Sequence, residues 1–127
     1  MLLSFLFGKK GECRRLNKDA ASIVEATRFG QHSEKQCAAA LLTRRSLAAI
    51  HEATDADPGR YAPALERMRV HHREARRGAR DTELTAFTLC IIYLRSEQLG
   101  EEALPARESI DDFLSDWAHV EDDFVSA

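Results

Sequence analysis

The sequence has few residues that interrupt regular secondary structure, with six glycines and three prolines among 127 residues. This scarcity favours long elements joined by few turns. The three cysteines, Cys13, Cys37 and Cys90, are odd in number and lack the C-x-x-C spacing of redox and zinc sites. We therefore expect reduced thiols and a cytoplasmic setting.

Long hydrophobic runs are also missing. The opening, MLLSFLFGKK, has six hydrophobic residues in its first seven positions. This run is too short to span a bilayer. Its positive charges follow the apolar run, whereas in a secretory signal they precede it. Three roles stay open for this segment: filling a groove of its own fold, binding another protein, or lying in a membrane interface with Lys9 and Lys10 at the headgroups. The candidate partner-binding side chains in it are those of Leu2, Leu3, Phe5, Leu6 and Phe7.

The composition that remains is globular, with 44% hydrophobic and 31% charged residues. A chain of this length normally forms one domain. We expect an all-α, single-domain bundle of about five helices over residues 16–127, preceded by an apolar segment and a polar link over residues 1–15. Short loops favour antiparallel neighbours in such a bundle.

Capping residues indicate where the first two helices begin. Asn17 is a good N-cap and predicts a helix over residues 17–29, which the following glycine ends. Ser33 and Gln36 have the spacing of a capping box and predict a second helix over residues 33–53. That helix is apolar on nearly every face, so we expect it to be central and heavily buried.

The next two helices have similar signals. Asp57, directly before a proline, predicts a helix over residues 58–77, and Asp81 predicts one over residues 81–100. The centre of the latter, residues 86–94, is rich in β-branched and aromatic residues and resembles a buried strand. Its capped length nevertheless favours a helix.

The last helix is expected to begin near Pro105, and it has the clearest amphipathic pattern in the chain. Acidic residues occupy its opposite face. Because acids near a C-terminus oppose the helix dipole, we expect residues 121–127 to fray unless a basic neighbour pairs with them. The apolar stripe consists of Ile110, Phe113, Leu114, Trp117, Val120 and Phe124.

The net charge of −3 is unevenly distributed along the chain. Residues 1–45 and 60–80 are basic, whereas residues 96–127 are acidic, so we expect a basic segment and the acidic last helix to lie side by side and neutralise each other. The sequence does not favour nucleic acid as a partner, because the chain is acidic overall and no aromatic residues interleave with the arginines for stacking. The arginines that share one helical stripe, and form the second candidate partner-binding surface, are Arg69, Arg73, Arg76 and Arg80.

Metal and catalytic signals are weak. Three pairs have ligand-like spacing within a helix, but the chain has no Glu-x-x-His, which a dinuclear helical bundle requires. Cys13 lies in a basic stretch that would lower its pKa, yet no histidine is near it in the sequence. We therefore expect no cofactor and no resident metal, and an enzyme is less favoured than a binding protein. The three pairs are His71 with Glu74, Asp116 with His119, and His51 with Asp55.

The sequence thus favours a non-enzymatic protein-binding module: an adaptor, an accessory protein or an inhibitor, with homodimerisation as one form of binding. A peripheral membrane protein anchored by residues 1–10 is the first alternative, and a metal-binding helical bundle is the second. Fourteen arginines against four lysines indicate a GC-rich bacterial genome.

Overall fold

Five α-helices and two short 3₁₀ turns make up the computed structural model, which describes residues 2–30 and 32–120, with side chains from residue 8 onward. No strand occurs within these residues, so the predicted all-α bundle of about five helices is confirmed. The elements are α1 (Leu2–Gly30), α2 (Ser33–Thr54), η1 (Pro58–Arg60), α3 (Ala62–Arg77), α4 (Asp81–Leu99), η2 (Glu101–Ala103) and α5 (Leu104–Ser115).

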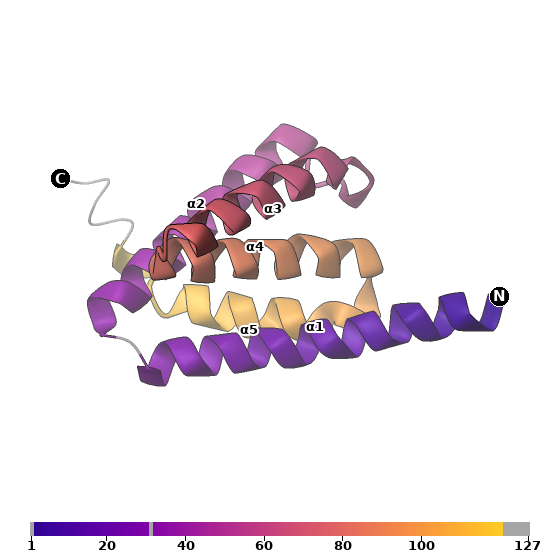
Figure 1. Ribbon diagram of the computed structural model, residues 1–127, viewed down its shortest axis with the longest axis horizontal. Helices are drawn as coiled ribbons and strands as arrows, with labels where there is room; N and C mark the ends of the chain where they lie inside the picture. Colours follow the sequence, from indigo (N-terminus) through magenta and orange to yellow (C-terminus); the bar gives the residue numbers. More distant parts are fainter. Residues whose placement is uncertain (1, 31, 121–127) are drawn as a thin grey trace.

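Helix α4 lies at the centre of the bundle and contacts all four other helices. In Figure 1, α2 and α3 cover one side of it, and α1 and α5 cover the other. Its sequence explains this position, because apolar residues on several faces need neighbours on several sides. The segment that resembled a strand is helical, as its length predicted. The buried apolar side chains of α4 are those of Ala86, Leu89, Cys90, Ile92, Leu94 and Leu99.

The first helix begins at Leu2 and not at Asn17, so the prediction of a polar link before residue 16 is wrong. Asn17 lies inside α1 and instead caps another helix. Its side-chain oxygen accepts a hydrogen bond from the backbone N–H of Ala106 in the first turn of α5, at 2.9 Å, and its amide donates to the carbonyl of Glu102, at 3.0 Å. Asn17 therefore does act as a cap, but it caps a helix that is distant in the sequence.

Helix α2 has nearly the predicted bounds, but the predicted capping box is absent and the helix is not buried all round. His32 is the N-cap without a side-chain hydrogen bond, and Gln36 donates to the carbonyl of Arg28 at 2.7 Å. Only one stripe of α2 is buried, since Ala48 and Ala49 are exposed. Alanine is tolerated on a solvated helix face because its helix propensity is high.

The remaining boundaries lie near the predicted ones, but Arg80 and not Asp81 is the N-cap of α4, without a side-chain hydrogen bond, and α3 begins only at Ala62. Asp57 caps the turn η1, where its carboxylate accepts the N–H of Gly59 at 3.0 Å. The predicted stripe of α5 is buried at Ile110, Phe113 and Leu114, and Trp117 packs against the core while still partly exposed. The last stripe residue, Phe124, and the predicted fraying of residues 121–127 lie outside the described residues.

Candidate interaction surfaces

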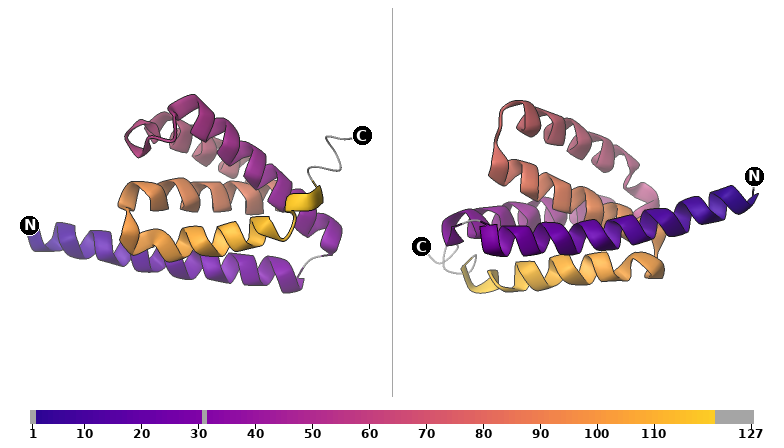
Figure 2. Two further views of the ribbon diagram at one scale, coloured as in Figure 1. Left: turned by 180° about the vertical axis from the view of Figure 1, so that it is seen from behind. Right: turned by 60° about the horizontal axis from the view of Figure 1, so that its bottom comes forward.

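The N-terminal end of α1 extends beyond the rest of the bundle, as both views in Figure 2 show. We call residues 2–11 the overhang. Gly8, Lys9 and Lys10 are exposed, and neither Gly8 nor Gly11 has a heavy atom near the position that a Cβ would take. With a rise of 1.5 Å per residue, the overhang is about 15 Å long. The predicted binding residues Leu2, Leu3, Phe5, Leu6 and Phe7 belong to this part of the helix, their side chains lie outside the described ones, and their role stays a prediction.

The base of the overhang is fixed to the bundle. Glu12 accepts two hydrogen bonds from the guanidinium of Arg95 on α4, at 2.7 and 2.9 Å. These hydrogen bonds lower the pKa of the Glu12 carboxyl. One residue further on, Cys13 is buried, and burial raises its pKa, so the predicted activation of this thiol by basic neighbours is wrong. Helix α1 is therefore held firmly from residue 12 onward.

An apolar groove lies at the other end of α1, between the first turns of α2 and the turn that follows α5. We call it the distal groove, and its volume is about 440 Å³. Cys37 lines it and is partly exposed. Sequence reasoning missed the groove, because its two walls are about 80 positions apart along the chain. The lining residues are Ser33, Glu34, Cys37, Ala38, Leu41, Trp117 and Val120.

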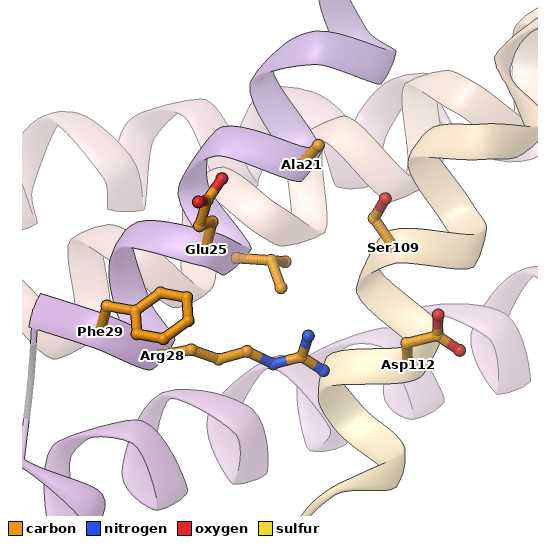
Figure 3. Close-up of a pocket in the computed structure, with 7 residues that line it drawn as sticks. Ala21, Glu25, Arg28, Phe29, Ser109 and Asp112 are labelled. Carbon is orange, nitrogen blue, oxygen red and sulfur yellow. The ribbon is translucent and has the colours of Figure 1, made fainter.

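A second, more polar hollow of about 340 Å³ lies between α1 and α5 (Figure 3). Arg28 reaches from α1 towards α5 across this hollow and pairs with Asp116, at 2.7 Å from Nη2 to Oδ2. Phe29 borders it and is 84% exposed, an unusual position for a phenylalanine. The same end of the molecule therefore combines an exposed aromatic ring with an apolar groove.

The four arginines of the predicted stripe are exposed, but only Arg69, Arg73 and Arg76 lie on α3, because this helix ends at Arg77 and Arg80 is the N-cap of α4. Within the described residues, none of the four pairs with the acidic last helix. Helix α4 stands between α3 and α5 (Figure 1). Arg69 and Arg80 instead lie 3.8 and 3.4 Å from carboxylates three residues away on the chain. Within the described part of the chain, no acidic side chain lies within ion-pair distance of Arg73 or Arg76. The basic segment that does lie beside α5 is α1, through Arg28.

One partly buried polar cluster contains groups that are common in catalysis. Glu97 on α4 contacts His51 Nε2 at 2.6 Å through one carboxylate oxygen, and accepts the hydroxyl of Tyr61 at 2.7 Å through the other. Burial and this hydrogen bond raise the pKa of Tyr61. Both oxygens of Glu97 are thus occupied within the fold, and the two hollows described above have other linings. The cluster ties α2, the start of α3 and α4 together.

Two of the three pairs proposed as metal ligands have members that pair elsewhere, one of them being Asp116, which contacts Arg28. His51 contacts Glu97 and not Asp55, whose carboxylate pairs with Arg60 at 2.8 Å. His71 and Glu74 do lie near each other, at 3.9 Å. Among the residues that the structure describes, no three ligand-type side chains gather closely enough to hold a metal ion.

Comparisons add no relative from which a role for these surfaces could be inferred. No family model, curated protein or solved structure matches this chain. Within the described ranges, no helix has the length and apolar character needed to cross a membrane. A proposal about function therefore depends on the surfaces themselves.

Proposed function

We propose that this protein is a non-enzymatic, cytoplasmic binding module that attaches to a protein partner through the overhang of α1. The observation that carries the proposal is the position of residues 2–11, which continue α1 past the bundle although their sequence is strongly apolar. A folded protein rarely leaves such a segment in water unless it has a binding role. An apolar helix in the groove of a partner is a common mode of recognition.

The attachment of α1 supports this proposal further. Because Glu12 and Cys13 hold the helix at its emergence from the bundle, the overhang extends from a rigid base. A helix that is already formed loses less conformational entropy on binding than a disordered tail does. The overhang is therefore suited to bind as a preformed element.

A variant with a polar overhang tests the proposal. It replaces Leu2, Leu3, Phe5, Leu6 and Phe7 by glutamine, a good helix former. If these side chains face a partner, the variant unfolds at the wild-type temperature, within about 2 °C, but no longer retains the proteins that wild type captures from extract of its own cells. Val70→Gln, on α3, is the control and keeps full binding. A large loss of thermal stability in the polar-overhang variant, measured at a concentration at which wild type is monomeric, would show that the segment packs on its own fold, and would refute the proposal.

A peripheral membrane protein is the second candidate function. Lys9 and Lys10 are exposed directly after the apolar residues, and Arg14 and Arg15 are exposed one turn later. Each basic side chain near an anionic surface contributes about 1 kcal/mol to binding. Co-sedimentation with phosphatidylserine vesicles tests this function, and equal partitioning of wild type and the polar-overhang variant would exclude it.

A further inference from the structure

We infer that the distal groove receives the overhang of a second copy of this chain. The inference rests on the proposed function and gives the overhang a specific partner, the protein itself. It requires a groove of suitable chemistry, an overhang that cannot reach its own groove, and charges that favour the pairing.

The chemistry of the groove suits an apolar helix. Its walls are formed by the aliphatic and aromatic side chains of Leu41, Trp117 and Val120 together with the small residues Cys37 and Ala38. A volume of about 440 Å³ is within the usual range for sites that enclose a ligand. Small residues beside large ones let a helix approach closely and insert its side chains between them. The overhang offers leucine and phenylalanine for this purpose.

An overhang that fills the groove must come from another molecule. The overhang and the groove lie at opposite ends of α1, because α2 begins with Ser33 directly after α1 ends at Gly30. Helix α1 has 29 residues, and at 1.5 Å per residue it is about 43 Å long. A continuous helix of this length does not fold back on itself. The pairing of two different surfaces therefore joins copies, either reciprocally in a dimer or in an open row.

The charges at the two ends are complementary. The overhang contains Lys9 and Lys10 and no acidic residue. The groove is lined by Glu34, and Asp112 is exposed on the neighbouring part of α5, whereas Asp116 is already paired with Arg28. Attraction between these groups increases the rate of encounter and fixes the orientation in which the helix enters. The association should accordingly weaken as salt is raised.

Two full-length variants and their mixture test the inference. The first is the polar-overhang variant, which keeps an intact groove. The second is Ala38→Arg, which places a long cation in the groove but keeps an intact overhang, since Ala38 is exposed. Ala49→Arg, at an exposed alanine of the same helix outside the groove, is the matched control. Molar masses are measured by light scattering after size exclusion, and thermal unfolding confirms that each variant folds.

We expect wild type and Ala49→Arg to associate as their concentration rises. Each of the two variants alone should associate about tenfold more weakly or worse. Their equimolar mixture should form a one-to-one dimer, because one partner supplies the groove and the other supplies the overhang. The chain's single tryptophan, Trp117, lines the groove, so its emission should shift to shorter wavelength in the mixture.

Other outcomes overturn the inference. Wild type that stays monomeric at every concentration excludes self-association. Unchanged association of Ala38→Arg excludes the groove as the binding site. If, in addition, the polar-overhang variant folds but no longer retains proteins from cell extract, the proposed function stands while this inference falls. If removal of residues 121–127 shifts the emission of monomeric Trp117 to longer wavelength, and mixing changes nothing, the chain's own C-terminal segment is the occupant. Wild type that binds only vesicles assigns the overhang to a lipid surface instead.

Discussion

Two side chains of the predicted apolar stripe, one on α5 and one in the turn that follows it, should differ widely in their contribution to stability. Phe113 has 0% of its surface exposed, whereas Trp117, one turn later, lines the open distal groove. Replacing Phe113 by alanine removes a fully enclosed ring and leaves a sealed cavity, which costs about 3 to 5 kcal/mol. Sequence periodicity alone assigns the same loss to Trp117.

The structure lowers that expectation for Trp117. Part of its ring already faces solvent, and truncation widens an open groove without creating a cavity. With about 25 cal/mol for each Å² of apolar surface and no cavity contribution, we expect Trp117→Ala to lower the free energy of unfolding by about 1 to 2 kcal/mol.

Urea unfolding followed by far-UV circular dichroism measures both losses. With a slope near 2 kcal/mol per molar urea, the midpoint should fall by about 2 M for Phe113→Ala and by under about 1 M for Trp117→Ala. Val70→Ala, at an exposed position, is the control. Equal losses for the two aromatic residues would show that Trp117 is enclosed in solution, and would refute the reasoning that treats the groove as open.

Three further predictions concern single side chains. Arg76→Ala should change the free energy of unfolding by less than about 0.5 kcal/mol, because this exposed side chain has no ion-pair partner in the described part of the chain; a larger loss in chemical denaturation would mean that the arginine stripe packs on something. Arg95 lowers the pKa of Glu12 in the folded state, so their pairing should make wild type more stable than Glu12→Gln by about 1 kcal/mol above pH 5. This advantage should be lost as the pH falls through the lowered pKa of Glu12. A stability difference that stays constant from pH 7 to pH 3 would contradict this linkage. Cys37 should react with a thiol reagent in the native protein while Cys90, whose pKa burial raises to about 12, reacts only after unfolding, and equal native rates would show that the core opens readily.

Local patterns in the sequence were sufficient for the class of fold and for most helix positions. The stripe through Ile110 and Phe113 predicted a buried face, and Asp57 before a proline predicted a helical start, because both signals involve residues within a few positions of one another. The exposure of the stripe arginines on α3 followed in the same way from helical spacing.

Contacts between distant segments were beyond the reach of those patterns. Asn17 has the properties of a cap, and only the packing of α1 against α5 made Ala106 its partner. His51 lies 46 positions from Glu97 in the sequence and contacts it because α2 and α4 run in the same direction, so that their C-terminal halves lie together.

The sequence by itself determined that the chain forms amphipathic and apolar helices, since periodicity and capping act over one or two turns. Only the tertiary structure decided which end of α1 the bundle leaves uncovered, that Trp117 borders a groove, and that α4 separates the arginines of α3 from the acids of α5. The physical reason is that tertiary packing depends on which whole helices bury their apolar faces against each other. This packing brings together side chains that are far apart in the sequence, and no local sequence pattern indicates that they will meet.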